Sequence, residues 1–245
     1  MRTRIDLHGH AALITGAGRR LGEAFARAVA GAGGDVCLHY GTTSADALAV
    51  ELTTTHGVRA VVLQADLADV HAASGLVDRA IERLGEIDLL VNSASVFGSA
   101  TLADTDVESW QHHLAVNLTA PFLLSQAFAR QRDGRPGAIV NLLDWRALRP
   151  GPDHLAYTVS KSGLAALTLS LAQSLAPGIR VNGLALGAIL PPPDASGEDD
   201  RPAALAPLRR WGTIEETCDA LLFLLAGPDF ITGEILHLDG GRHLT

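Results

Sequence analysis

Tyr157 and Lys161 are the two residues of this sequence whose types and spacing best suit acid-base chemistry. They lie one helical turn apart in an apolar run with helical periodicity, so both side chains fall on one face of a helix. A free phenol titrates at about pH 10, and a nearby ammonium group lowers the pKa of the phenol. A tyrosine tuned in this way can protonate a substrate atom as the substrate receives a hydride. The alternative is a surface tyrosine beside a solvated lysine.

A glycine-rich turn, Gly16-Ala-Gly-Arg-Arg-Leu-Gly22, follows the first expected strand at residues 11–15 and leads into a helical pattern. Strand, turn and helix together match a unit that binds a dinucleotide pyrophosphate at the N-terminus of the helix. Free N–H groups and the positive end of the helix dipole meet the anion there. Gly16 allows the tight turn and Gly22 allows the helix to pack closely. A simple turn is the alternative.

The second expected strand, residues 35–40, ends without the carboxylate that binds the ribose hydroxyls in NAD-specific folds. Arg19 and Arg20 add positive charge to the glycine turn, and guanidinium and hydroxyl groups suit a 2′-phosphate. We therefore predict NADPH as the cofactor in preference to NADH. The hydroxyl groups expected around this phosphate are those of Thr42, Thr43 and Ser44, and His39 and Tyr40 at the strand end are further expected cofactor contacts. The hydroxyl groups of residues 42–44 also suit a helix N-cap, and both roles can hold.

Five further apolar segments have the character of strands, at residues 58–63, 87–91, 138–143, 179–184 and 234–238. Helical patterns separate them, which predicts an α/β fold: a single-domain, Rossmann-like, doubly wound parallel sheet of about seven strands with helices on both faces. Ligands bind beyond the carboxyl ends of such strands. The residues expected at those ends are Thr15, Tyr40, Asp66, Asn92 and Asp144. Their shared edge predicts one site in a single domain that spans residues 1–245.

The composition narrows the class of protein. A formal charge of −8 argues against a nucleic-acid partner. The N-terminal residues lack the apolar core of a secretory signal, and no apolar run reaches membrane-spanning length, so we expect a cytoplasmic protein. Cys37 and Cys218 fall in separate apolar patterns, which favours buried free thiols over a disulfide or a metal site.

Residues 187–207 interrupt the alternation of strands and helices with a stretch rich in proline, glycine and acidic residues. A long insertion in a compact domain is either functional or disordered. Because this one follows a strand's carboxyl end, we expect a flap that covers the substrate, with a passive loop as the alternative.

Taken together, these residues resemble the short-chain dehydrogenase/reductase family over nearly the whole chain. The glycine turn resembles the family's cofactor turn, Asp66 its adenine-contacting acid and residues 92–95 its strand-four motif. Asn117, Tyr157 and Lys161 match its catalytic residues, and residues 239–241 are similar to its C-terminal signature. The resemblance implies a homotetramer.

The resemblance also implies roles for individual residues. Lys161 would bind the nicotinamide ribose, and Asn117 would hold a water in a proton relay. Further cofactor contacts are implied for Gly16, Leu21, Leu67, Asn92, Ala94, Ser95, Tyr157, Lys161, Gly187 and Ile189.

Two departures from the family pattern narrow the subgroup. Arg20 stands where the family usually has a third glycine, and Asp144 stands where it usually has a catalytic serine. Both changes resemble the pteridine reductases and the bacterial dihydromonapterin reductases. Phe97 matches the aromatic residue on which their pterin ring stacks. The basic residue that those enzymes often have soon after the second strand is missing here.

The resulting hypothesis is hydride transfer from NADPH to a C=N bond of a small-molecule dihydropterin, with Tyr157 and Asp144 managing the proton. Dihydromonapterin, dihydrobiopterin and dihydrofolate are the candidate substrates. The expected substrate contacts are Arg20, Ser95, Phe97, Asp144 and Tyr157, with Arg20 facing either the pterin or the cofactor phosphate. Three alternatives remain: a 3-oxoacyl or other carbonyl reductase, an inactive NADPH-binding sensor, and a purely capping role for Asp144.

Overall fold

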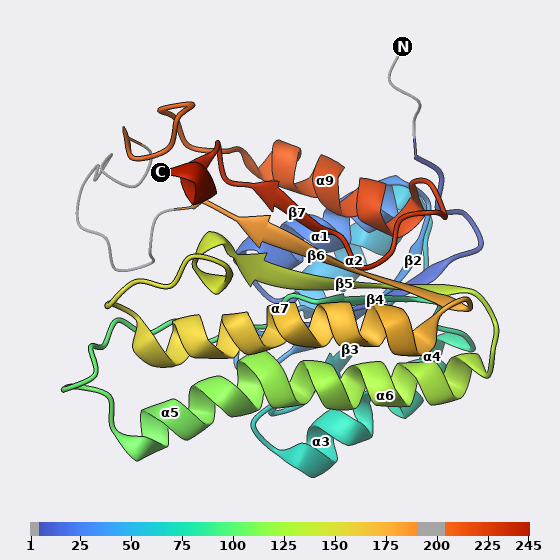
Figure 1. Cartoon of the computed structure of the whole chain (residues 1–245). Coiled ribbons are helices and arrows are strands. Elements are labelled where there is room, and N and C mark those ends of the chain that lie inside the picture. Colours follow the sequence, from blue (N-terminus) through green and yellow to red (C-terminus); the bar gives the residue numbers. More distant parts are fainter. Residues whose placement is uncertain (1–4, 191–203) are drawn as a thin grey trace.

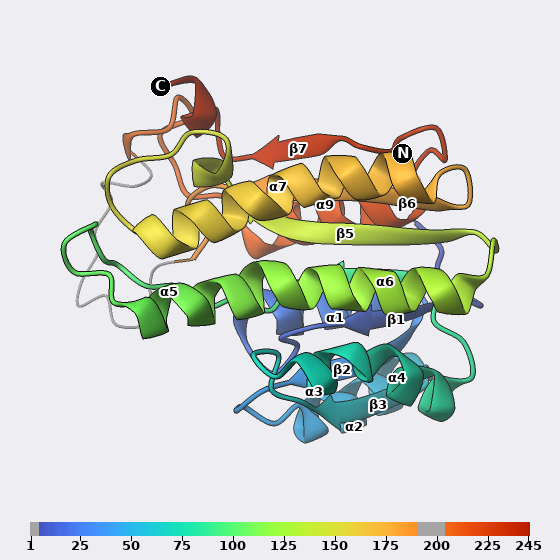
Figure 2. The same ribbon diagram turned by 60° about the horizontal axis from the view of Figure 1, so that its bottom comes forward.

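A parallel sheet of seven strands forms the centre of the protein (Figures 1 and 2), whose structure is a computed structural model that describes residues 5–190 and 204–245. The strand order is β3-β2-β1-β4-β5-β6-β7, and every neighbouring pair is parallel. The strands are β1 (Ala11–Ile14), β2 (Asp35–Tyr40), β3 (Ala60–Gln64), β4 (Leu89–Asn92), β5 (Gly137–Asp144), β6 (Ile179–Leu186) and β7 (Ile235–Leu238). This is the predicted doubly wound α/β fold.

Helices cover both faces of the sheet because alternate residues of each buried strand point to opposite sides. On one face, Ile14 packs with apolar residues of α1 (Arg20–Gly31), α2 (Asp46–His56) and α9 (Ile214–Ala226). On the other face, Leu13 packs with residues of α3 (Val70–Ser74), α4 (Leu76–Leu84), α6 (Ala120–Arg132) and α7 (Leu155–Leu175). The remaining described helices are α5 (Val107–Leu114), η1 (Ala115–Thr119), η2 (Trp145–Ala147) and η3 (Arg242–Leu244).

The topology fixes where a ligand can bind. The chain runs outward from β1 to β3 and then returns to add β4 on the other side of β1. The crevice at this reversal, beyond the carboxyl ends of β1 and β4, is the usual ligand site of such sheets. The glycine turn leaves β1 at this edge, and residues 93–98 leave β4 beside it.

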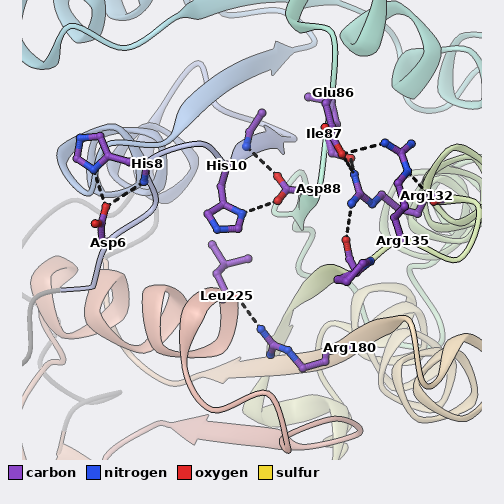
Figure 3. A network of polar contacts seen from close by, with 12 residues as sticks. Asp6, His8, His10, Glu86, Ile87, Asp88, Arg132, Arg135, Arg180 and Leu225 are labelled. Atoms are coloured by element: carbon purple, nitrogen blue, oxygen red, sulfur yellow. Dashed lines mark hydrogen bonds and ion pairs between the residues drawn. The ribbon is translucent and has the colours of Figure 1, made fainter.

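The opposite edge of the sheet is closed by polar contacts (Figure 3). Asp88, just before β4, accepts a hydrogen bond from the backbone N–H of Ala11 and pairs with the ring of His10. Arg132, which is 5% exposed, pairs with Glu86. The His10–Asp88 contact therefore joins the starts of β1 and β4, and the Arg132–Glu86 pair joins the end of α6 to the segment before β4, far from the carboxyl edge.

The structure changes the boundaries of several strands expected from the sequence. The third strand begins at Ala60 rather than residue 58, and β5 and β6 run on to Asp144 and Leu186. Residues 191–203 of the expected flap lie outside the described residues. Within the described part of the chain, no helix has the length and apolar character needed to cross a bilayer, and no cluster of metal-ligating residues occurs.

Candidate active site

Tyr157 and Lys161 lie in the first turns of α7 and are both buried, with 7% and 3% of their surfaces exposed. The ammonium nitrogen of Lys161 donates a hydrogen bond to the carbonyl oxygen of Leu142, at 2.7 Å, and lies 5.8 Å from the centre of the Tyr157 ring. The helix therefore holds both groups at the carboxyl edge of β5, in the arrangement that the spacing predicts.

Asp144 is the last residue of β5 and faces Tyr157. The Tyr157 hydroxyl donates to Oδ2 of Asp144 at 3.2 Å, and Oδ1 accepts the backbone N–H of Arg146 at 2.8 Å. The second contact caps η2. The carboxylate is thus both a cap and a partner of the tyrosine, so the two interpretations drawn from the sequence coexist.

The groups around Tyr157 correct the expectation that Lys161 lowers the pKa of its phenol. Burial, and then Asp144, raise the pKa of Tyr157 well above its usual value, so Lys161 does not convert it into a phenolate. Burial also lowers the pKa of Lys161 to about 8, against the pull of Asp144. Burial raises the pKa of Asp144, while the backbone N–H and the charge of Arg146 oppose that rise. Tyr157 is therefore a neutral phenol that holds a proton at neutral pH.

Asn117 is fully buried in η1, a single π-helical turn between α5 and α6. Its Oδ1 accepts hydrogen bonds from the Ser95 hydroxyl and the Val96 N–H, and its Nδ2 donates to the Val96 carbonyl and the Ser160 hydroxyl. These four bonds use the full capacity of the amide. The side chain therefore positions residues 95–96, and the water relay that the family resemblance implies stays a prediction.

Phe97 forms the exposed wall of the site. Its ring is 53% exposed, packs edge-on against Tyr157 at 4.8 Å between centroids, and stacks on His154 at 4.6 Å. A half-exposed aromatic platform thus lies beside the Tyr157 ring. Such a platform suits a flat heteroaromatic ring, which gains of order 1 kcal/mol from offset stacking.

His154 and Arg146 are site residues that the sequence did not reveal. His154 adopts a left-handed conformation (φ 53°) just before α7, and its Nδ1 lies 2.9 Å from the Gly98 carbonyl. Arg146 donates to Asp153 at 3.2 Å, and the same Asp153 oxygen lies 3.5 Å from Nε2 of His154. Neither residue belongs to a spacing pattern; only the left-handed turn and the loop closure bring them to Tyr157.

The glycine turn fits a dinucleotide. Gly16 has a left-handed backbone (φ 71°), a Cβ on Gly18 would overlap the Thr43 carbonyl, and a Cβ on Gly22 would overlap the Gly16 carbonyl. The first turn of α1 has no side-chain cap, so its N–H groups remain available to an anion. Thr15 accepts the N–H groups of Ser93 and Ala94 and joins the turn to the end of β4.

Arg19 and Arg20 are exposed at this turn, as a contact with a phosphate requires. Arg20 has φ 54°, so it occupies the left-handed conformation that a third glycine would adopt freely. Thr42 and Thr43 are also exposed nearby. The N-cap of α2 is Ala45 rather than the predicted Ser44, whose hydroxyl nevertheless accepts the Asp46 N–H at 3.1 Å.

Some predicted cofactor residues have side chains that point into the fold. His39 is 2% exposed; its Nδ1 accepts the Gly16 N–H at 3.2 Å and its Nε2 lies 3.1 Å from the Ala65 carbonyl. It therefore supports the glycine turn from beneath instead of meeting a ligand. The Asn92 amide donates to Asn141 at 2.8 Å, inside the sheet.

The other predicted cofactor residues divide by exposure. Leu67 and Ile189 are buried in the core, with 7% and 8% of their surfaces exposed. Asp66 and Ser95 are exposed, and Leu21, Tyr40, Ala94 and Gly187 are partly exposed around the same edge.

Comparisons with known proteins agree with this geometry. A family model described as Enoyl-(Acyl carrier protein) reductase matches residues 16–243. Pteridine reductase 1 of Leishmania tarentolae is 34% identical, with 96% of this chain and 96% of that protein covered. A 3-oxoacyl-(acyl-carrier-protein) reductase of Synechocystis sp. is 31% identical, with 96% and 97% covered.

The fold is shared with a solved enzyme. FolM alternative dihydrofolate reductase 1 from Brucella canis, complexed with NADP, superposes with a TM-score of 0.92 at 34% identity and covers 100% of this chain and 97% of that chain. Its similarity and that of pteridine reductase 1 support the subgroup suggested by Arg20 and Asp144, although 3-oxoacyl reductases also match. The chain belongs to the short-chain dehydrogenase/reductase family.

Proposed function

We propose that this protein is an NADPH-dependent reductase that transfers a hydride to a C=N bond of a dihydropterin and gives the tetrahydro form. The observation that carries the proposal is the carboxylate of Asp144 at hydrogen-bond distance from the Tyr157 hydroxyl, 3.2 Å. Similarity to pteridine reductase 1 and to an alternative dihydrofolate reductase supports the same substrate class.

A carboxylate suits a pterin better than a ketone. A serine at this position would donate a hydrogen bond to a carbonyl oxygen, whereas an ionised aspartate only accepts. A pterin offers N–H and amino donors to such an acceptor, together with a ring nitrogen that must be protonated. Phe97, half-exposed and beside Tyr157, would provide a surface on which a flat ring can stack.

NADPH is the proposed cofactor and supplies the hydride when bound. Arg19 and Arg20, at the uncapped start of α1, would pair with its phosphates, and the buried Lys161 would bind its ribose. Solved relatives complexed with NADP support this assignment.

The residues of this chain manage the proton. Tyr157 holds a proton at neutral pH because burial and Asp144 both raise its pKa. It therefore gives that proton to the substrate nitrogen as the adjacent carbon is reduced, which adds one hydride and one proton across the C=N bond. Asp144 orients the phenol and accepts from the pterin, while Asn117 fixes the backbone at Val96 beside the platform.

The decisive experiment follows the loss of NADPH absorbance with dihydromonapterin, dihydrobiopterin and dihydrofolate, beside a 3-oxoacyl thioester. Turnover of a dihydropterin supports the proposal, and the ranking of the three assigns the natural substrate. Turnover of the thioester alone favours the second candidate, a 3-oxoacyl reductase, which the match to the Synechocystis enzyme supports. Tight NADPH binding with no turnover would favour a sensor.

We also propose that the enzyme is a cytoplasmic, single-domain homotetramer. The exposed apolar side chains of α6 and α7, Phe122, Val159 and Leu169, support an assembly through these helices.

A further inference from the structure

We infer that Arg146 is a positioning residue of this site: bridged to Asp153, it holds the Asp144 carboxylate toward the Tyr157 hydroxyl and supplies the positive charge beside it. The inference deepens the proposed function and rests on it only for the identity of the substrate.

The two oxygens of Asp144 have separate partners. Oδ2 accepts the Tyr157 hydroxyl at 3.2 Å, whereas Oδ1 accepts the backbone N–H of Arg146 at 2.8 Å and lies 4.0 Å from the guanidinium of the same residue. Arg146 therefore contacts Asp144 twice on the side away from Tyr157. These contacts of Oδ1 favour the orientation in which Oδ2 faces the phenol.

Arg146 is itself held in place. Its other terminal nitrogen donates to Asp153 at 3.2 Å, and its guanidinium lies 4.7 Å from the centre of the Trp145 ring. Its side chain is only 21% exposed. Because Asp153 immediately precedes the start of α7, the bridge joins the two ends of the loop between β5 and the helix that carries Tyr157.

The bridge continues to the aromatic platform. The Asp153 oxygen that receives Arg146 also lies 3.5 Å from the His154 ring, and this ring stacks on Phe97. Phe97 in turn meets Tyr157 edge-on. Tyr157, Asp144, Arg146, Asp153, His154 and Phe97 thus form a closed circuit of contacts around the exposed face of the platform.

Arg146 is also the cation best placed to oppose the burial of Asp144. The charged and titratable groups that act on Asp144 are Arg146 from η2 and Tyr157 and Lys161 from α7. Lys161 already donates to the Leu142 carbonyl, and its own pKa is lowered to about 8. Without the Arg146 side chain, the burial that raises the pKa of Asp144 would be opposed by the backbone N–H of residue 146, by Lys161 and by the Tyr157 hydroxyl, with no guanidinium charge among them.

The test compares Arg146→Gln with Arg149→Gln. Arg149 is an exposed arginine of the same loop that bonds to the His243 carbonyl, so its replacement removes the same charge without touching Asp144. The first readout is the titration of the Asp144 carboxyl carbon by NMR in the free protein, assigned with Asp144→Asn. The second is the pH profile of kcat/KM with a dihydropterin.

We expect the Asp144 titration to move to higher pH in R146Q and to stay at the wild-type pH in R149Q. We expect kcat/KM to fall about 10²-fold in R146Q, as for a misplaced catalytic group. Arg146→Lys should restore the titration but only part of the rate, because lysine lacks the guanidinium fork. Asp153→Asn, which keeps the Arg146 charge, should lower the rate with little change in the titration.

Equal titrations of Asp144 in R146Q and R149Q would overturn the inference. If R146Q does not fold, Arg146→Met, which keeps an unbranched apolar stem and removes the charge, carries the same expectation. A shifted titration in a protein that reduces no dihydropterin would sustain the inference while refuting the proposed function.

Discussion

Tyr157 holds its proton for two reasons that the structure separates: its burial, and the carboxylate of Asp144 beside it. Lys161, four residues along the same helix, is engaged with the Leu142 carbonyl and is not among the groups that shift the tyrosine. A neutral phenol carries the proton that a reduction needs, although its raised pKa makes it a weaker acid than a free phenol. The protonation state of Tyr157 therefore depends on its burial and on Asp144 more than on Lys161.

Replacement of Tyr157 by phenylalanine removes the proton and keeps the ring that packs against Phe97. We expect kcat for dihydropterin reduction to fall about 10²–10⁴-fold, the usual contribution of a general acid. NADPH affinity, measured by fluorescence titration, should change little. A variant that keeps nearly full activity would exclude the acid role.

Asp144→Ser would convert the carboxylate acceptor into a hydroxyl donor of the kind that the family usually has. We expect dihydropterin turnover to fall at least about 10²-fold, because the acceptor for the pterin N–H groups is lost. Reduction of a ketone panel should hold steady or rise. Unchanged discrimination between pterins and ketones would show that Asp144 is only the cap of η2.

Arg20→Gly tests which ligand the arginine faces. Glycine accepts the left-handed backbone at this position (φ 54°) without steric cost, so the free energy of unfolding should stay within about 1 kcal/mol of the wild type. If Arg20 pairs with the 2′-phosphate, KM for NADPH should rise about 10-fold, the effect of one charge-assisted hydrogen bond, while KM for NADH stays constant. A rise in KM for the pterin alone would assign Arg20 to the substrate.

The site residues that belong to sequence motifs could be predicted, whereas those that a loop places at the site could not. Tyr157, Lys161 and Asp144 could be found because helix periodicity and strand ends place them. Arg146 and His154 could not be found, because no periodicity determines that an arginine after a strand reaches across to Asp153. The buried His39 also misled, since a side chain at a strand end can turn under the sheet as readily as over it.

At the scale of elements, the glycine turn rests on a buried imidazole. The Gly16 N–H donates to Nδ1 of His39, so the neutral ring must use its Nε2–H for the Ala65 carbonyl. Protonation of the His39 ring would place an N–H at Nδ1, where it would face the Gly16 N–H, donor against donor. Burial accordingly lowers the pKa of His39 from 6.5 to about 4. The loop that binds the cofactor is therefore coupled to the pH of the medium.

This coupling predicts how stability depends on pH. The unfolded chain protonates the imidazole below about pH 6.5, whereas the folded chain does so only below about pH 4. Stability from this group is therefore complete above pH 6.5 and is lost as the pH falls through that window, by about 3 kcal/mol in total. Urea unfolding of His39→Gln should show a flatter pH dependence than the wild type. His112→Gln, at an exposed position, should retain the wild-type slope; equal slopes in all three proteins would contradict the prediction.

The strands were predictable as elements but not to the residue. Continuous apolar segments between helical patterns indicate a parallel sheet, and all seven expected segments became its strands. The predicted start of β3, residue 58, lies two residues before the observed start at Ala60. The N–H of Arg59 donates to the Asp35 carboxylate at 2.7 Å instead of to a backbone carbonyl of the neighbouring strand. Strand ends are determined by such partners from other strands, which periodicity within one segment does not show.

On the scale of the whole molecule, α7 presents an unusual outer surface. Lys161 is the one charged residue in this 21-residue helix, and it is buried. Val159 and Leu169 are 38% and 42% exposed on α7, and Phe122 is 41% exposed on α6. The two helices lie on the same face of the sheet (Figure 1). A long helix that exposes apolar groups and no charge is typical of a surface that a partner covers.

We therefore expect a homotetramer that buries this surface, and a charge placed on it should break the assembly. Leu169→Glu combined with Val159→Glu would desolvate two unpaired carboxylates at such an interface, which costs several kcal/mol per buried charge. Light scattering after size exclusion should then show smaller species than the wild-type tetramer, with unchanged circular dichroism. Phe230→Glu, at a fully exposed phenylalanine outside these helices, is the matched control and should remain tetrameric. Because Val159 lies two residues after Tyr157, dissociation should also reduce dihydropterin turnover; an intact, active tetramer in the double variant would place the interface elsewhere.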